Sequence, residues 1–148
     1  MTEVVSKSRR QTVELGEKLG AVLEGGELIA FFGGLGMGKT CFTEGLACGM
    51  GINSEVSSQT FALVHEYNGK LPLYHFDMYR ITSFDDLCST GFFDYLDTGG
   101  VLAVEWSENI ENILPDGNVI RIEISCGKSD GERILKMSGD RKYEDSWR

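Results

Sequence analysis

Two apolar runs stand out in the hydrophobic pattern of the chain. Residues 28–32, "LIAFF", and residues 101–104 within "GGVLAVEW" are continuous rather than alternating. Strands that are buried on both faces of a sheet have this pattern, because neither face meets water. The two runs therefore predict central strands, the second of which ends in Glu105.

Helical spacing appears on either side of the first run. The segment "RRQTVELGEKLGAVLEGG" has apolar residues three to four positions apart, which predicts an amphipathic helix ended by Gly25 and Gly26. Residues 41–50, "CFTEGLACGM", are apolar on two helical faces, one of which carries Cys41 and Cys48. This pattern predicts a helix that is largely buried.

The second half of the chain contains alternating patterns. "FALVHEY" and "LPLYHFDMY" flank "NGK", which predicts a hairpin. "VIRIEIS" alternates cleanly, and "ERILKMS" is expected to pair with it. "SFDDLCSTGFFDYL" predicts one or two short helices, and "SENIENIL" predicts another that ends before Pro115. The tail, about residues 140–148, has no core pattern and is expected to be flexible unless Trp147 docks.

Length and charge narrow the class of protein. A chain of 148 residues is expected to form one domain. A net charge of −9 argues against a broad nucleic-acid surface, since neutralising phosphates needs clustered Lys and Arg. No apolar stretch approaches the ~20 residues of a membrane span, and "MTEVVSKSRRQT" lacks the apolar core of a signal peptide, so a cytoplasmic protein is expected.

The cysteines do not indicate a metal site. They lie far apart, with no C-x-x-C pair, which disfavours zinc binding. We expect reduced and mostly buried thiols. The four are Cys41, Cys48, Cys88 and Cys126.

The most informative motif is "GGLGMGKT", from Gly33 to Thr40, which completes the pattern G-x-x-x-x-G-K-T between a predicted strand and a predicted helix. Glycines let backbone N–H groups point inward as an anion nest at a helix N-terminus. Lys39 is expected to reach the β- and γ-phosphates, and the Thr40 hydroxyl to bind Mg²⁺. The layout predicts an α/β protein of the P-loop NTPase fold, with a mixed, mainly parallel central sheet flanked by helices and with antiparallel strands added.

Magnesium at such a loop needs a second anchor, an acid at the end of a neighbouring buried strand. Glu105 is the candidate, although it could instead cap the helix that follows, and Glu108 is the weaker competitor. In "YHFDMYR", Asp77 shares a strand face with His75 and is expected at the strand end. There it could orient the attacking water or a water on Mg²⁺, and a local turn or cap is the alternative.

Four further residues are candidates for a role at this site. His75 is better explained as a hydrogen-bonded structural histidine than as a ligand or base. Arg80 is the nearest candidate for a cation that faces the phosphates. In "SSQTF", Ser58 and Thr60 lie where a segment that senses the γ-phosphate is expected, and a plain turn is equally compatible.

Together these pieces resemble the TsaE (YjeE) family, the small bacterial ATPases of tRNA threonylcarbamoyladenosine synthesis. The family's approximate order is G-D-L-G-A-G-K-T, S-P-T-F/Y-x-L-V, Y-H-F-D-x-Y-R, G-x-x-D-Y and E-W. Here "GGLGMGKT", "SQTFALV", "YHFDMYR", "GFFDY" and "EW" follow in that order, within a span from about Thr12 to Arg133. "YHFDMYR" followed by "VEWSE" is much more specific than the P-loop alone.

The resemblance implies a Mg²⁺-dependent ATPase. It implies Mg²⁺ at Thr40 and Glu105, with Asp77, Glu105 and Lys39 as catalytic residues and Trp106 as the tryptophan beside the acid. The implied nucleotide contacts are the loop with its flanks and two distant residues, Arg133 being near the base. They are Gly33, Gly34, Leu35, Gly36, Met37, Gly38, Lys39, Thr40, Cys41, Thr12 and Arg133.

The resemblance also implies partners. TsaD and TsaB carry out the threonylcarbamoyl transfer, so this chain would meet tRNA only through their complex, which fits its acidic charge. Arg80 is the only cation besides Lys39 that we can nominate, so we expect slow hydrolysis alone and faster hydrolysis with the partners.

Two departures bear on catalysis. Gly34 stands where the family usually has aspartate, and Gln59 where it has proline. They leave the hydrolysis rate more open than the binding. A nucleotide-gated binding module with incidental hydrolysis and a P-loop small-molecule kinase are the alternatives. The kinase is disfavoured because no Arg-rich segment follows the P-loop helix.

Overall fold

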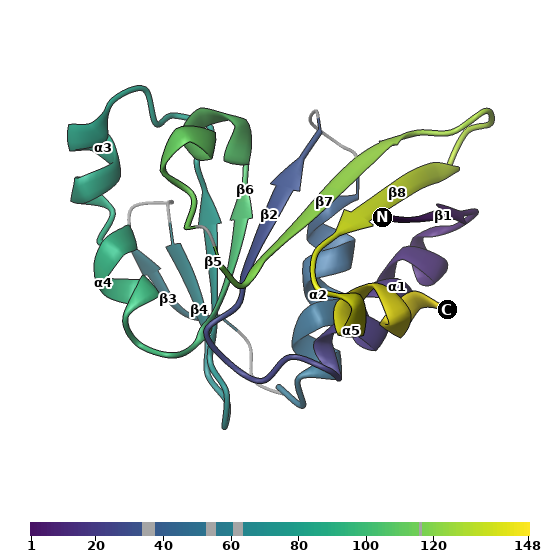
Figure 1. Cartoon of the computed structure of the whole chain (residues 1–148), viewed down its shortest axis with the longest axis horizontal. Helices are drawn as coiled ribbons and strands as arrows, with labels where there is room; N and C mark the ends of the chain where they lie inside the picture. The colour runs from purple at the N-terminus through teal and green to yellow at the C-terminus, as the bar shows by residue number, and fades with distance from the viewer. Residues whose placement is uncertain (34–37, 53–55, 61–63, 116) are drawn as a thin grey trace.

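The computed structural model describes residues 1–33, 38–52, 56–60, 64–115 and 117–148, with only the backbone described for 56–60. These residues form one eight-stranded sheet in the order β1-β8-β7-β2-β6-β5-β4-β3 (Figure 1). The strands are β1 (Thr2–Ser6), β2 (Leu28–Phe32), β3 (Val56–Thr60), β4 (Val64–Tyr67), β5 (Leu73–Asp77), β6 (Val101–Glu105), β7 (Val119–Cys126) and β8 (Arg133–Ser138).

Strand direction divides the sheet into a parallel centre and antiparallel ends. Strands β7, β2, β6 and β5 are parallel neighbours, whereas β1, β8 and β7 on one side and β5, β4 and β3 on the other pair antiparallel. The continuous apolar strands β2 and β6 lie at the centre, and the β4–β5 and β7–β8 pairs form as predicted. The predicted mixed sheet is therefore confirmed.

Helices cover both faces of the sheet. On one face, α1 (Arg9–Gly20) and α2 (Lys39–Gly49) share a core cluster with β2, β7 and β8. On the other, α3 (Phe84–Ser89), α4 (Phe92–Leu96) and the 3₁₀ helix η1 (Ser107–Ile113) pack on β2, β5 and β6. Figure 1 shows the first pair behind the β7–β8 side and α3 and α4 at the opposite end.

Helices α1 and α2 approach each other at glycines. A Cβ on Gly16 would lie 2.3 Å from the carbonyl oxygen of Phe42, and one on Gly45 would lie 2.1 Å from that of Val13. The same relationship recurs one turn later, at Gly20 and Gly49. Real Cβ contacts are essentially never under 3.0 Å, so only glycine fits at these positions. The P-loop helix is thereby held directly against α1.

Two boundaries at the N-terminal end differ from the sequence prediction. Helix α1 ends at Gly20, before Gly25 and Gly26, which form the turn into β2. The carboxylate of Glu27 holds this turn by accepting from the N–H groups of Glu24 and Gly25, at 2.8 and 2.7 Å. Strand β1 was not predicted, because five residues with only partial burial give no clear period.

The C-terminal segment folds onto the core. Its short helices are α5 (Arg141–Glu144) and η2 (Asp145–Trp147). The indole of Trp147 is buried, donates to the carbonyl of Leu15 at 3.0 Å and meets the Phe42 ring at 5.9 Å. Of the two alternatives for this tail, docking through Trp147 is the one that the structure has.

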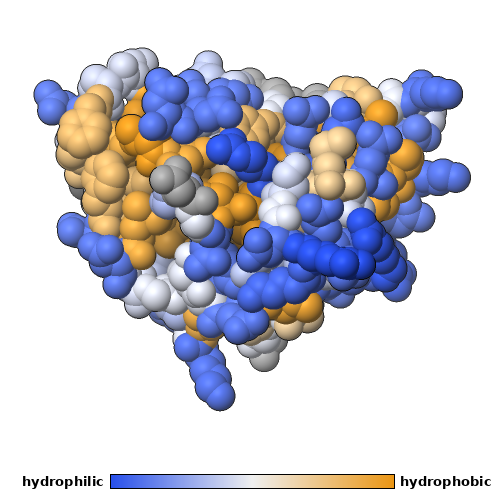
Figure 2. Space-filling model, viewed as in Figure 1, coloured by the Kyte–Doolittle hydropathy of each residue, from blue (hydrophilic) through white to orange (hydrophobic). Residues whose placement is uncertain are grey.

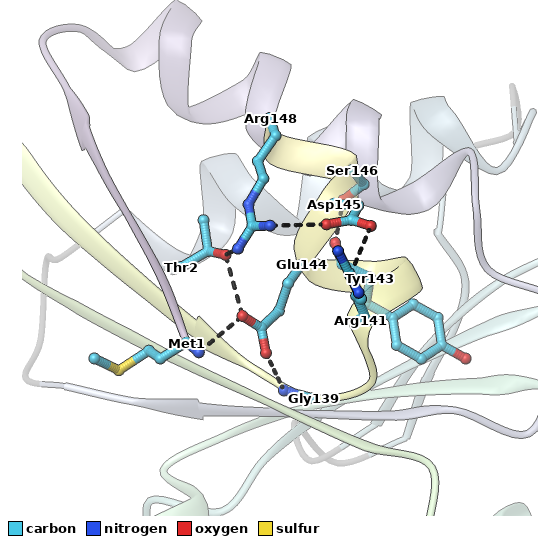
Figure 3. A network of polar contacts seen from close by, with 9 residues as sticks. All are labelled: Met1, Thr2, Gly139, Arg141, Tyr143, Glu144, Asp145, Ser146 and Arg148. Atoms are coloured by element: carbon cyan, nitrogen blue, oxygen red, sulfur yellow. Dashed lines mark hydrogen bonds and ion pairs between the residues drawn. The ribbon is translucent and has the colours of Figure 1, made fainter.

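Polar contacts join the C-terminal segment to β1. The carboxylate of Glu144 accepts from the α-amino group of Met1 at 2.9 Å and from the Thr2 hydroxyl at 3.1 Å (Figure 3). Arg148 donates to both Thr2 and Asp145, at 3.3 and 3.0 Å. The two ends of the chain therefore lie side by side.

The cysteines correct one expectation. Cys48, Cys88 and Cys126 are exposed and Cys41 is half-buried, so the thiols are not mostly buried. Helix α2 is largely buried, as predicted, and Cys48 lies with Glu44 on its narrow solvent face. All four cysteines lie in the described residues, and none is in a disulfide. Among the described helices, none has the length and apolar character needed to cross a membrane.

Candidate functional site

The loop after β2 is bounded by two glycines with positive φ. Gly33 has a φ of 131°, and a Cβ there would lie 2.4 Å from the carbonyl oxygen of Ile124. Gly38, with a φ of 93°, is the N-cap of α2. A left-handed N-cap without a side chain leaves the first N–H groups of α2 open to a bound anion. Gly34, Leu35, Gly36 and Met37 lie outside the described residues.

Lys39 is buried at the start of α2 and points across the loop. Its Nζ donates to the carbonyl of Gly33 at 2.7 Å and lies 4.7 Å from the centroid of the Trp106 ring. An ammonium over an indole face is an attractive contact. The lysine of the loop and the residue after β6 are thus neighbours, which links the motif to the predicted metal acid.

Trp106 has an unusual backbone. Its φ of 59° and ψ of 42° are left-handed, a strained conformation for a bulky residue. Its ring contacts Tyr79 at a centroid distance of 5.1 Å, so Lys39 and Tyr79 both pack on the indole. Strain of this kind is concentrated at functional sites.

The acids lie where the sequence places them. Strands β5 and β6 are parallel and in register, with Asp77 opposite Glu105 and His75 opposite Ala103. Ala103 belongs to the core cluster that α1 and α2 share with the sheet. His75, Asp77 and Glu105 therefore lie on that same face of the sheet. His75 Nε2 and Glu105 Oε2 share a hydrogen bond of 2.5 Å.

The environment of Glu105 favours its charged form. Burial raises the pKa of this carboxyl. The hydrogen bond and charge of His75, with the charges of Lys39 and His65, lower the pKa by more than burial raises it. The pKa of Glu105 is therefore below its ordinary value. An ionised carboxylate stands beside the loop at neutral pH.

The residues present fit a magnesium ion. Mg²⁺ prefers oxygen ligands, and a site with substrate phosphates needs only one or two protein ligands. The carboxylate of Glu105 and the hydroxyl of Thr40, which is exposed in the first turn of α2, are oxygen donors of this kind. In the described part of the chain no three His, Cys, Asp or Glu side chains gather as a self-sufficient metal cage.

Asp77 and Glu108 both contact backbone N–H groups. Asp77 Oδ1 accepts from the N–H of Tyr79 at 3.0 Å, so it makes the local cap that was the alternative to a catalytic role. Glu108 Oε2 accepts from the N–H of Gly33 at 3.2 Å. The competitor of Glu105 therefore reaches the loop itself, a contact that the sequence did not indicate.

Of the two distant residues predicted to contact the nucleotide, Thr12 lies beside the loop and Arg133 lies farther away in the sheet. Thr12 is buried beside the loop, with its methyl 3.8 Å from where a Cβ on Gly38 would be, and its hydroxyl shares a 2.7 Å hydrogen bond with Ser6. Arg133 begins β8, two strands from β2, and donates to the carbonyl of Glu132.

Other predicted site residues are described less fully. Cys41 is half-buried in the first turn of α2, and Arg80 is exposed in the turn after β5. The side chains of Ser58, Gln59 and Thr60 are not described, but their backbone belongs to the edge strand β3, so the plain-turn alternative is wrong.

The alternation of side chains along β5 could have indicated the contact between His75 and Glu105, which the sequence analysis did not predict. His75 lies two residues before Asp77, so both face the side on which Glu105 ends β6.

A hollow of about 490 Å³ also opens beside the loop, within the size range of ligand pockets. It is lined by Phe32, Gly33, Glu108, Glu123, Ile124, Ser125 and Cys126.

Comparison with known proteins gives a consistent result. A family model described as "Threonylcarbamoyl adenosine biosynthesis protein TsaE" matches residues 6–135. A tRNA threonylcarbamoyladenosine biosynthesis protein TsaE from Treponema pallidum is 41% identical over 135 residues, which cover 90% of this chain and 98% of the relative. The protein of that name from Bacillus subtilis is 37% identical over 135 residues, with 90% and 84% covered.

A solved structure supports the same assignment. The crystal structure of Bacillus subtilis YdiB matches with a TM-score of 0.75 and 32% sequence identity. The match covers 98% of this chain and 90% of that one. The likeness therefore extends over the whole sheet and its helices.

Proposed function

Because the chain belongs to the TsaE family of tRNA threonylcarbamoyladenosine biosynthesis, we propose that it binds and hydrolyses ATP with Mg²⁺ at the loop from Gly33 to Thr40. The single observation that carries this proposal is the cluster around Lys39. The lysine lies against Trp106, and the carboxylate of Glu105 is close enough for the lysine charge to lower its pKa.

Each residue has a role that its contacts support. Lys39 would exchange its bond to the Gly33 carbonyl for the phosphates, which are stronger acceptors because they are charged. Thr40 and Glu105 would hold Mg²⁺, which neutralises charge on the phosphates when bound. Asp77, opposite Glu105, would orient the attacking water with the oxygen that does not cap Tyr79.

The partner part of the proposal is that this ATPase acts on a complex of TsaB and TsaD in the cytoplasm. The acidic net charge supports it, because a −9 chain has little means of holding tRNA by itself. Fast phosphoryl transfer needs a cation facing the γ-phosphate, and Arg80 is exposed in a turn. We therefore expect slow turnover alone and a faster rate, or a functional reset, with the complex.

Phosphate release with and without TsaB–TsaD tests this function. We expect Mg²⁺-dependent release that rises when the complex is added. Release that appears only with an added small-molecule acceptor would favour a kinase. ATP binding without release under either condition would favour the nucleotide-gated binding module, which the local cap that Asp77 makes at Tyr79 also supports.

A further inference from the structure

A groove of about 190 Å³ lies on the sheet face away from α1 and α2, between the start of α3 and the helix η1. Ile81, Phe84 and Leu87 form one wall, and Asn109, Ile110 and Ile113 form the other. The groove is separate from the loop that would hold ATP.

Two exposed phenylalanines mark one rim of the groove. Phe84 is 61% exposed, and its ring lies 5.7 Å from that of Phe93 in α4, which is 36% exposed. We call the groove and these two rings the aromatic groove. Figure 2 shows hydrophobic side chains gathered at the end of the molecule where α3 and α4 lie, bordered by hydrophilic ones. Grouped exposed aromatic side chains beside a hollow are typical of protein interaction sites.

The charge around the aromatic groove is mainly negative, although exposed Arg80 directly precedes Ile81. Residues 81–120 include no lysine, arginine or histidine. Asp85, Asp94 and Asp97 are exposed on α3, on α4 and just after α4. Hydrogen bonds from Thr82 lower the pKa of Asp86, so that carboxyl is also ionised. Such a surface repels RNA and anionic lipid and attracts a basic protein surface.

Helix η1 connects the aromatic groove to the ATP loop. At its start, Trp106 packs on Lys39 and Glu108 accepts from Gly33. One turn further, Asn109 lines the groove and donates to the carbonyl of Met78 at 2.7 Å, and Ile110 is buried beneath it. A shift of η1 that follows release of Lys39 from Trp106 would therefore change the groove wall.

We propose that the aromatic groove is a docking surface for a protein partner that presents an apolar projection surrounded by lysine and arginine, and that η1 couples docking to the nucleotide at the loop. The inference rests on the proposed function and deepens it, because it names the surface through which a partner would act. Linkage requires that a partner which prefers the ATP form must tighten ATP binding by the same factor.

Affinity measurements with the TsaB–TsaD complex test the docking surface. The Phe84→Ser/Phe93→Ser double variant should bind about 30-fold more weakly or worse, as aromatic anchors do when truncated. Val5→Ser is the matched control, because Val5 is 43% exposed on β1 at the far edge of the sheet. It should bind like the wild type, and all variants should keep the intrinsic ATPase rate.

Charge and nucleotide give two further readouts. Asp85→Lys/Asp94→Lys should also weaken binding, and wild-type affinity should fall with added salt. Affinity should differ between a non-hydrolysable ATP analogue and ADP, and equal affinities would overturn the coupling through η1. Tight binding of tRNA alone at this surface would overturn the argument from charge.

The outcomes separate this inference from the proposed function. If the wild type binds the complex and the double variant binds equally well, the aromatic groove is wrong and the proposed partner stands. If the wild type does not bind in any nucleotide state, the proposed partner is wrong, and the docking inference falls with it.

Discussion

His75 holds the carboxylate of Glu105 across two neighbouring parallel strands, through a 2.5 Å hydrogen bond at the carboxyl edge of the sheet. One oxygen of the predicted magnesium ligand is therefore held by a side chain of the neighbouring strand. Outer contacts of this kind orient ligands and keep them charged. If Glu105 holds Mg²⁺ as proposed, His75 would contribute to that site through Glu105 without touching the ion.

His75→Ala should weaken Mg²⁺-dependent ATP hydrolysis by roughly 10- to 100-fold, because Glu105 would lose its orienting donor. The half-saturating Mg²⁺ concentration should rise, and His75→Gln, which retains an N–H donor, should recover part of the loss. Mn²⁺ binding followed by electron paramagnetic resonance gives a readout independent of turnover. Val5→Ser is the control, because Val5 is exposed on β1 at the far edge of the sheet. Unchanged metal dependence in His75→Ala would contradict the assignment.

Lys39→Ala should lower ATP affinity by roughly 10- to 100-fold, the value of a charge-assisted hydrogen bond to phosphate. Titration calorimetry of the folded variant measures it. Lys39→Arg keeps the charge but not the compact head group, so its ATP affinity should lie between those of the wild type and Lys39→Ala. Full affinity in a folded Lys39→Ala protein would mean that the loop does not bind phosphate as proposed.

Glu105→Ala and Glu108→Ala distinguish the two candidate acids. Glu105→Ala should leave nucleotide binding in place and reduce Mg²⁺-dependent hydrolysis roughly 100-fold or more. Glu108→Ala should change loop stability more than metal dependence, because Glu108 accepts from the N–H of Gly33. Measuring phosphate release against Mg²⁺ concentration decides between them, and the reverse pattern would show that Glu108 is the metal acid.

Tyr143→Phe should make stability less dependent on alkaline pH. Burial, then the hydrogen bond to Glu27, raises the pKa of the Tyr143 phenol to about 12 in the folded protein, above the ordinary 10.0. The stabilisation is therefore complete below about pH 10 and is lost as the pH rises towards 12. At neutral pH, the variant should be less stable by about 1–3 kcal/mol, because buried Glu27 loses a donor.

Urea unfolding at neutral pH and near pH 11 measures this difference. The gap between the wild type and Tyr143→Phe should narrow at the higher pH, because the wild type alone loses the contribution. A gap that stays constant would mean that the phenol and Glu27 do not share a buried hydrogen bond in solution.

Gly45→Ala should reduce the free energy of unfolding by about 1–3 kcal/mol or more, since its Cβ would overlap the carbonyl oxygen of Val13. Gly117→Ala is the matched control, because a Cβ there meets no atom of the described residues within 4 Å. Its effect should stay within about 0.5 kcal/mol. Equal effects in thermal or chemical unfolding would contradict the close approach of α1 and α2.

Much of the fold follows from local pattern, which is why β2, β6 and the β4–β5 hairpin could be predicted. The glycine contacts between α1 and α2 could not, because Gly16 and Gly45 have meaning only once the two helices are placed together. The docking of Trp147 depends likewise on residues more than a hundred positions away.

The candidate site divides in the same way. Asp77 and Glu105 end β5 and β6, as the sequence predicted from motif and strand pattern. The hydrogen bond of His75 needs the register of β5 against β6, and the left-handed backbone of Trp106 has no sequence signature. Contacts between elements, rather than within them, are what single-sequence reasoning misses.

The glycines between α1 and α2 also limit how this protein can move. At four positions the backbones meet with no intervening side chain, so sliding or rotating one helix past the other would drive a carbonyl oxygen into a Cα. Rotamer changes cannot relieve such a clash, as they can at ordinary helix contacts. We therefore expect α1 and α2 to move together as one unit. If nucleotide exchange changes the conformation of this protein, we expect α3, α4 and η1 to move on the opposite face of the sheet. These helices contact the sheet through side chains, whose rotamers can change.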